Sequence, residues 1–313
     1  MDIILHLGAH RTASTSFQLY MRRNRRALGA AGIAFWGPRQ TRNGLLNGAI
    51  STPGTMPAAR QLRRARGRIA LQVYKLREAG MQRLVLSDEN LIGSPRRNIR
   101  DMRLYPAAGE RMARYREALG GRIARVVLSI RAQDAYWTSL LAYSIPRGGA
   151  LPDSARLKRI AQEPRSWRDV ITDLACALPG TELCVLPHEA FASRPERKLA
   201  AMCAMDAPPL CAAREWLNRS PRPDELRALL AERGEAPQLD AAPGDAQWTP
   251  FNPAQKAAMR ESYADDIYWL RAGADGLAIL TETPAEAGTV KTPALRAETR
   301  RGSRHDQGQR HLA

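Results

Sequence analysis

Short apolar runs alternate with amphipathic stretches along the chain, and this alternation constrains the fold more than any other feature. Buried strands are expected at 3–7, 33–36, 84–87, 123–130 and 182–186. The apolar spacing between and after them predicts helices at 14–28, 58–79, 110–119, 135–143, 167–178 and 196–202. Alternating strands and helices build parallel sheets. The sequence therefore predicts an α/β fold, with a parallel β-sheet flanked by helices on both faces.

The pattern continues to about residue 280 and then stops. Two more helices are expected at 223–233 and 253–270, and a chain of 313 residues with 44% hydrophobic content can bury one sizeable core. We therefore expect a single domain over 1–280. Residues 281–313 are polar, basic and poor in large apolar side chains, so they cannot offset their ordering entropy. This segment is predicted to be a disordered C-terminal tail.

The net charge of +17 favours a negatively charged partner, such as an acidic glycan, for the basic surface. Only five of the 48 basic residues are lysine, and GC-rich codon usage also produces an arginine bias of this kind. The run from Arg60 to Arg68 suits contact with an acidic glycan, although a solvated basic face explains it too. No aromatic residues interleave with this run, so specific nucleic-acid binding is not predicted.

Targeting and redox signals are weak. The chain enters its first strand immediately, and no apolar run approaches the ~20 residues that span a bilayer. The four cysteines form no C-x-x-C pair and lack nearby histidines, which predicts reduced thiols and no metal site. A cytoplasmic protein without a transmembrane segment is expected.

Gly8 to Thr15 lies between the first strand and the first helix, where main-chain N–H groups and the helix dipole favour an anion. The nucleotide triphosphatase pattern G-x-x-x-x-G-K-[ST] requires Gly and Lys where this chain has Ala13 and Ser14. An ATPase or kinase is thus disfavoured. The cation is instead Arg11, and hydroxyl side chains follow it.

This loop resembles the 5′-phosphosulfate loop of the sulfotransferases, which commonly reads Lys-Thr-Gly-Thr-Thr, with Arg for Lys in the tyrosylprotein branch. The resemblance implies that 3′-phosphoadenosine 5′-phosphosulfate (PAPS) contacts His10, Arg11, Thr12, Ala13, Ser14, Thr15 and Ser16. Ala13 departs from the family's glycine. If the loop takes a positive φ there, the Cβ atom costs about 1 kcal/mol.

A second resemblance lies downstream, where the strand at 123–130 ends at Arg131 and Ser139 follows eight residues later. Sulfotransferases hold the 3′-phosphate with an Arg and a Ser at this spacing, so the resemblance implies that role here. Arginine offers phosphate a forked donor. The family's Pro two residues after the Arg is replaced by Gln133.

The strand at 84–87 leads into Asp88, Glu89 and Asn90. Bacterial sulfotransferases often carry a Ser-x-Glu segment after a core strand, which makes Glu89 the expected general base. Arg11 would then stabilise the leaving phosphate oxygen, and no metal would be needed. Asp88 and His10 remain rivals as the base, and a capping or solvated carboxylate is the structural alternative for Glu89.

Two later segments, 185–191 and Leu217 to Ser220, also resemble the family and are expected to be structural, with Glu189 anchoring a turn. Together the matches imply a P-loop-like sulfotransferase architecture. The expected reaction transfers a sulfuryl group from PAPS to a hydroxyl or amine of a small molecule or glycan, with a carbohydrate favoured. The acceptor and the oligomeric state are not identified by the sequence.

Two alternatives stay open. A degenerate nucleotide kinase-like enzyme would use Asp88 as a magnesium ligand. A non-catalytic sulfotransferase-like protein would instead bind an anionic partner through its arginine-rich stretches.

Overall fold

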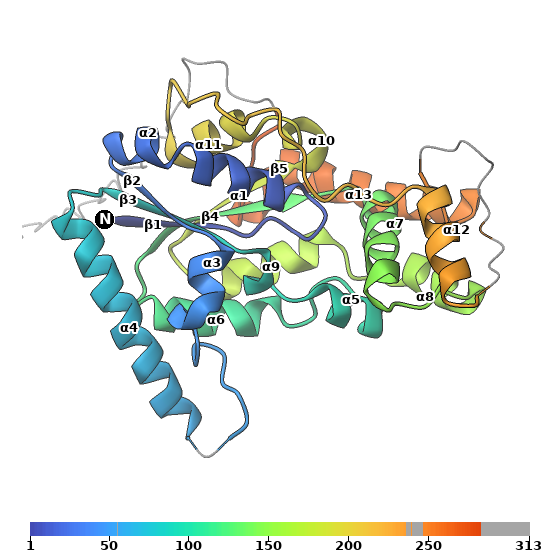
Figure 1. The fold of residues 1–313 in the computed structure, drawn as a ribbon, viewed down its shortest axis with the longest axis horizontal. Helices are drawn as coiled ribbons and strands as arrows, with labels where there is room; N and C mark the ends of the chain where they lie inside the picture. The colour runs from blue at the N-terminus through green and yellow to red at the C-terminus, as the bar shows by residue number, and fades with distance from the viewer. Residues whose placement is uncertain (55, 236–238, 240–246, 283–313) are drawn as a thin grey trace, which may run out of the picture.

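The structure, a computed structural model, describes residues 1–54, 56–235, 239 and 247–282. The predicted tail lies outside these residues from 283 onwards. In the described part, six strands form one parallel sheet in the order β2-β3-β1-β4-β5-β6. They are β1 (Asp2–His6), β2 (Ile33–Trp36), β3 (Arg83–Ser87), β4 (Ile123–Ile130), β5 (Glu182–Pro187) and β6 (Ile279–Leu280). The predicted parallel α/β fold is confirmed (Figure 1).

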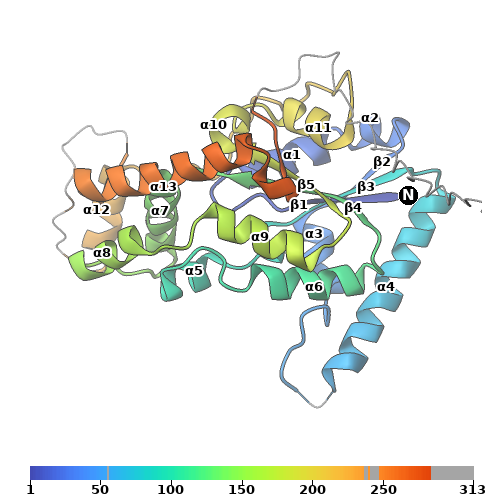
Figure 2. The same cartoon turned by 180° about the vertical axis from the view of Figure 1, so that it is seen from behind.

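Helices cover both faces of this sheet. One face carries α1 (Ser14–Arg23), α2 (Arg25–Ala30), α10 (His188–Phe191) and α11 (Pro195–Cys203), which lie above the sheet in Figure 1. The other carries α6 (Ala108–Ala118) and α9 (Trp167–Ala177), seen from behind in Figure 2. Side chains alternate along β1, so Ile3 and Leu5 join one core and Ile4 the other. Strands buried on both faces explain the continuous apolar runs in the sequence.

The remaining helices lie beyond or below the sheet. They are α3 (Pro38–Gln40), α4 (Ala58–Glu78), α5 (Pro95–Asp101), α7 (Gln133–Ser144), α8 (Ser154–Gln162), α12 (Pro223–Glu232) and α13 (Pro253–Arg271). A π-type turn spans Thr41–Leu45, and 3₁₀ turns span Glu89–Leu91, Ile145–Arg147 and Ala274–Gly276. Helix α4 projects away from the sheet as an arm (Figure 1). No helix in the described ranges is both long and apolar enough to cross a bilayer.

One predicted element is wrong. The single helix expected at 14–28 is two helices, α1 and α2, separated at Asn24. The buried Asn24 amide donates to the carbonyls of Tyr20 and Cys211, each at 2.8 Å. A side chain that competes for main-chain carbonyls in this way interrupts a helix, which is why asparagine favours helix ends.

The strand order places a crevice at the carboxyl ends of β1 and β4. These two strands are neighbours, but β1 leads to β2 on one side through α1, whereas β4 leads to β5 on the other side through α9. In parallel sheets such a switch point opens a binding crevice beyond the strands. The loop after β1 stays in register with β4, since Ala9 N–H donates to the Ser129 carbonyl at 3.0 Å.

Candidate functional site

The loop between β1 and α1 is tightly folded. The Thr12 hydroxyl donates to the Ala9 carbonyl at 2.6 Å, which closes the turn. Gly8 has no room for a side chain, because a Cβ atom there would lie 2.3 Å from Oγ of Ser14 and 3.0 Å from the His6 ring. Glycine is therefore required at this position by close approach.

Two loop residues adopt left-handed backbone conformations. Arg11 has φ 68° and Ala13, the residue before α1, has φ 62°. A left-handed conformation at residue 13 favours glycine, and alanine there costs about 1 kcal/mol. No side chain caps the start of α1, and its first turn has no acidic residue. Its first N–H groups are thus available to an anion.

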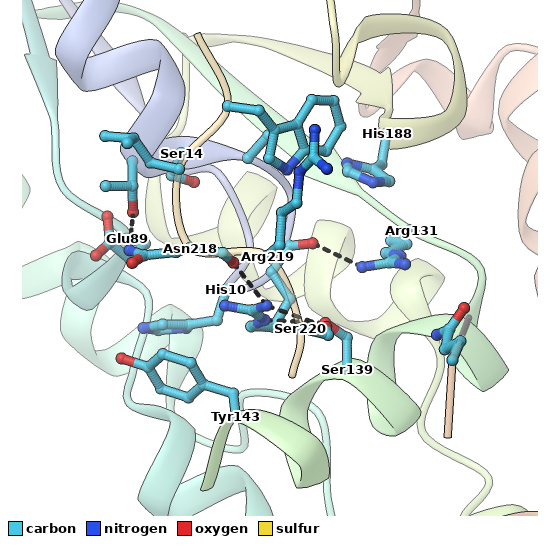
Figure 3. Close-up of a pocket in the computed structure, with 16 residues that line it drawn as sticks. His10, Ser14, Glu89, Arg131, Ser139, Tyr143, His188, Asn218, Arg219 and Ser220 are labelled. Carbon is cyan, nitrogen blue, oxygen red and sulfur yellow. Dashed lines mark hydrogen bonds between the residues drawn. The ribbon is translucent and has the colours of Figure 1, made fainter. Parts of the chain in front are cut away.

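The structure brings most predicted site residues to one cavity of about 270 Å³ at this crevice. It is lined by the loop residues His10, Arg11, Ala13, Ser14 and Thr15 and by Glu89, Arg131 and Ser139 from three other elements. Figure 3 shows Glu89 and Arg131 on opposite sides of this pocket. Thr12 and Ser16, both buried, lie outside the lining of the cavity. They support the loop from behind.

Arg11 reaches across the cavity to residues far along the chain. Its Nε donates to Oγ of Ser139 at 2.9 Å, and its Nη2 donates to the Asn218 carbonyl at 2.9 Å and to Oγ of Ser220 at 3.1 Å. Its guanidinium also lies 4.8 Å from the centroid of the Tyr143 ring. None of these partners is a carboxylate, so the positive charge of Arg11 is not neutralised.

Arg131 adds a second cation beside the first. Its Nη1 donates to the Arg11 carbonyl at 3.0 Å, joining the end of β4 to the loop between β1 and α1. Burial, and then the charge of Arg131, lower the pKa of Arg11 to about 10. Burial also lowers the pKa of Arg131. An anion placed between two guanidinium groups would remove this mutual penalty.

His188 lines the same cavity as an uncharged side chain. Burial, followed by the charges of Arg131 and Lys198, lowers the pKa of His188 to about 3. The imidazole is therefore neutral at physiological pH, and its buried Nδ1 has no hydrogen-bond partner among the described atoms. This wall of the cavity offers no negative charge that would compete with a phosphate.

His10 is fixed at both ring nitrogens. Nε2 lies 3.0 Å from Oδ1 of Asn90, which can only accept, so Nε2 carries the hydrogen. Nδ1 then accepts from the Tyr105 hydroxyl at 2.9 Å, and the same hydroxyl accepts from the His10 main-chain N–H at 2.8 Å. Burial lowers the pKa of His10. The imidazole orients the loop and has no free nitrogen with which to accept a proton.

Glu89 and its neighbour Asp88 differ in exposure to the cavity. Glu89 lines it, accepting from Nε2 of Gln18 and from Nη2 of Arg42, both at 2.8 Å. Asp88 points the other way and is held by the Thr41 hydroxyl at 2.5 Å and by Arg42 at 2.6 Å. Asp88 also accepts a hydrogen bond from the Asn90 N–H at 3.0 Å and so fixes the turn from Asp88 to Asn90. Gln18 and Arg42 were not predicted, and no sequence pattern marks them.

The segment Trp216 to Ser220 lines the cavity and crosses it as a strap. Asn218 donates through Nδ2 to Oγ1 of Thr15 at 3.0 Å, and Leu217 N–H donates to Oγ of Ser16 at 2.9 Å. The Ser220 hydroxyl lies 2.7 Å from that of Ser139. The Leu-Asn-x-Ser resemblance was the available sequence signal for this segment, and its contacts with Thr15, Ser16 and Ser139 fit the structural role that was predicted.

A buried polar cluster supports the loop from within the sheet. Lys198 is fully buried, donates to Oγ of Ser129 at 3.2 Å and lies 5.5 Å from the Phe17 ring centroid. Burial lowers the pKa of Lys198 to about 7. His6 pairs with the Ser87 hydroxyl at 2.8 Å, whereas its buried Nε2 has no partner among the described atoms.

Glu189 joins the end of β4 to the last helix. It accepts from the Ala132 N–H at 3.1 Å and from the Tyr263 hydroxyl at 3.0 Å, contacts that fit the predicted anchoring role.

No family model matches the chain, and comparisons with curated proteins and with solved structures likewise find no match. Any assignment of function depends on this geometry and on the resemblance of the loop and of the Arg131–Ser139 pair.

Proposed function

We propose that the protein is a sulfotransferase that moves a sulfuryl group from PAPS to an acceptor hydroxyl or amine. One observation carries the proposal. The loop between β1 and α1 lines a single cavity together with Arg131 and Ser139, although more than 100 residues separate the loop from this pair in the chain. The loop and the Arg–Ser pair each resemble a sulfotransferase motif, and they lie far apart in the sequence. Their convergence is the arrangement that a donor with a 5′-phosphosulfate and a 3′-phosphate needs.

The charges in the cavity favour such a donor. Two guanidinium groups, neither of them in an ion pair within the described residues, lie near the start of an uncapped helix, although Glu189 and Asp134 partly offset the charge of Arg131. A doubly phosphorylated ligand would occupy both regions, with one anionic group at the loop amides and the other at Arg131 and Ser139. Tyr143, beside Arg11, offers an aromatic face to the same cavity.

In the proposed reaction, the acceptor oxygen or nitrogen attacks sulfur in line with the bond to the 5′-phosphate. The new bond to sulfur forms as the bond between sulfur and the phosphate oxygen breaks, which releases 3′-phosphoadenosine 5′-phosphate. Glu89 accepts the acceptor's proton, and Arg11 together with the loop amides stabilises the charge on the leaving phosphate. Arg42 and Gln18 hold the Glu89 carboxylate in place for this role.

The kinase-like alternative fits the contacts less well. Asp88, its candidate magnesium ligand, uses both carboxylate oxygens for Thr41, Arg42 and the Asn90 N–H. A metal would have to displace these partners. Position 14 carries serine, so the lysine that contacts the β- and γ-phosphates in nucleotide triphosphatases is also missing.

Calorimetric titration tests the proposal directly. Wild-type protein should bind 3′-phosphoadenosine 5′-phosphate without metal and more tightly than ATP with magnesium. Arg131→Ala should weaken this binding at least about tenfold, as expected for loss of a charge-assisted hydrogen bond. Arg122→Ala removes an exposed arginine just before β4 and is the matched control. Preference for ATP with magnesium, or equal effects of the two substitutions, would refute the proposal.

A further inference from the structure

A second cavity, of about 660 Å³, adjoins the phosphate cavity through a shared wall. The wall is the turn from Asp88 to Asn90: Glu89 lines the phosphate cavity, whereas Asp88 and Asn90 line the second one. Arg42, which contacts Glu89, also lines the second cavity. The size lies within the ~300–1,000 Å³ range of small-ligand sites.

The second cavity is strongly basic. Arg42, Arg64, Arg68 and Arg111 line it, and Asp88 is its one carboxylate among the described residues. Arg42 neutralises that carboxylate, with 2.6 Å between Nη2 and Oδ1. The other three arginines have no carboxylate within ion-pair distance in the described part of the chain. A positive field with so little internal compensation attracts anions.

These arginines are held in a defined geometry rather than scattered. Gln61, Arg64 and Arg68 lie on one side of α4, at the three- and four-residue spacing that places side chains on a common helix face. Arg68 donates to the Asn47 carbonyl, which secures the loop before α4. Arg111 donates to the carbonyls of Leu91 and Asn90 at 2.9 and 2.7 Å. Arg64 has no such anchor in the described residues.

The rest of the lining suits a polyhydroxylated ligand. Amide and hydroxyl groups from Thr41, Asn47 and Asn90 alternate with apolar surface from Leu46, Ile50 and Tyr115. Sugars present hydroxyl groups together with apolar ring faces, and guanidinium groups pair with carboxylates in a forked geometry. A carboxylated sugar matches both features of the cavity.

We infer that this second cavity is the acceptor site and that it takes an acidic oligosaccharide, whose carboxylate is bound by Arg64, Arg68 and Arg111. The inference rests on the proposed sulfotransferase function, because it places the acceptor hydroxyl at the Glu89 end of the shared wall. Arg42 connects acceptor binding with proton removal, because it forms an ion pair with Glu89 and also lines the second cavity.

The test uses the full chain and a defined probe, a tetrasaccharide of alternating glucuronic acid and N-acetylglucosamine. Its carboxyl-reduced analogue is the neutral control. Binding is measured by calorimetry with and without 3′-phosphoadenosine 5′-phosphate. Arg64→Glu is compared with Arg63→Glu, because both residues are exposed on α4 but only Arg64 lines the cavity. The two variants have the same net charge, so a general charge effect would weaken both equally.

We expect the tetrasaccharide to bind wild type and Arg63→Glu similarly, Arg64→Glu at least tenfold more weakly, and the reduced analogue much more weakly than the acid. Equal loss in the two variants, or equal binding of the reduced analogue, would overturn the inference. So would Arg64-dependent binding of a single-stranded oligonucleotide in place of the tetrasaccharide. If Arg64-dependent tetrasaccharide binding occurs without binding of the bisphosphate, the acidic-sugar site stands and the sulfotransferase function fails. If the bisphosphate binds but the tetrasaccharide does not, the sulfotransferase function stands and the acceptor assignment fails.

Discussion

The Nε atom of Arg11 donates a 2.9 Å hydrogen bond to the hydroxyl of Ser139, joining the phosphate loop to the first turns of α7 across 128 residues of sequence. The same hydroxyl lies 2.7 Å from that of Ser220. Ser139 thus lies at a junction between the loop, the helix after β4 and the strap. Any ligand that binds at the loop and at Ser139 replaces or extends these bonds.

Ser139→Ala should weaken binding of 3′-phosphoadenosine 5′-phosphate by roughly tenfold. The substitution removes one hydroxyl contact and one partner of Arg11, and each hydrogen bond of this kind contributes about 1 kcal/mol. Ser144→Ala, on the same helix but outside the cavity, is the control, because its hydroxyl bonds only to the Leu141 carbonyl. Calorimetry on both variants checks this, and an unchanged affinity in Ser139→Ala would contradict the assigned contact.

Ala13→Gly should raise the free energy of unfolding by up to about 1 kcal/mol. Glycine adopts the φ of 62° without the Cβ penalty, although it also increases the entropy of the unfolded chain. Ala258→Gly, in an exposed part of α13, should have the opposite sign, a loss of about 1 kcal/mol. Urea unfolding of both variants gives the comparison. A loss of stability at both positions would show that the strain at Ala13 is negligible.

Glu89→Gln should lower kcat by about 10²- to 10⁴-fold while affinity for 3′-phosphoadenosine 5′-phosphate stays within twofold. The amide keeps the shape of the side chain but cannot accept the acceptor's proton. Transfer from radiolabelled PAPS to the acidic tetrasaccharide provides the rate. Asp88→Asn should instead lower the melting temperature, because Asp88 secures Thr41 and Arg42. A selective kcat loss in Asp88→Asn alone would assign the base to Asp88.

Lys198 should make stability depend on pH. Its folded pKa of about 7 lies below the unfolded value of 10.5, so between these values the unfolded chain binds a proton that the folded protein does not. The contribution of Lys198 to stability must therefore rise with pH, by about 1 kcal/mol per unit from pH 7.5 to 9. Lys198→Met should remove this slope and stabilise the protein most at pH 7.5.

Urea unfolding at several pH values measures the slope. His6 does not interfere, because burial lowers its pKa and its linked effect falls below pH 6.5. Burial raises the pKa of the thiols of Cys184 and Cys203, so these groups lower stability as pH rises toward 9, opposite in sign to Lys198. They act equally in wild type and Lys198→Met, so the difference between the two slopes isolates Lys198. An equal slope in wild type and Lys198→Met would mean that Lys198 is charged in the folded state.

The sheet and the phosphate loop were predictable because they depend on local pattern. Strands buried on both faces read as apolar runs, so β2 and β4 were predicted with the bounds that the structure has. The break at Asn24 was not predictable, since it depends on the carbonyl of Cys211, 187 residues away. Side-chain competition with a distant carbonyl leaves no periodic signal in the sequence.

The site was predictable only where a residue type and a strand end coincide. Arg11, Arg131 and Ser139 follow strands and carry phosphate-binding groups, and the structure brings them together. Arg42 belongs to an irregular π-type turn and is one of 43 arginines, so neither its position nor its type marked it. Its contact with Glu89 follows from tertiary packing alone.

The strap has a consequence for the order in which the protein becomes functional during synthesis. Once the first 150 residues have left the ribosome, β1, β4, the phosphate loop, Arg131 and Ser139 are all present. Residues 216–220, which supply Asn218 and Ser220 to the loop, come much later. A nascent chain that stalls just before them has five of the six strands, but its cavity lacks the strap. The last third of the chain therefore completes the wall of the cavity in which we propose that the donor binds.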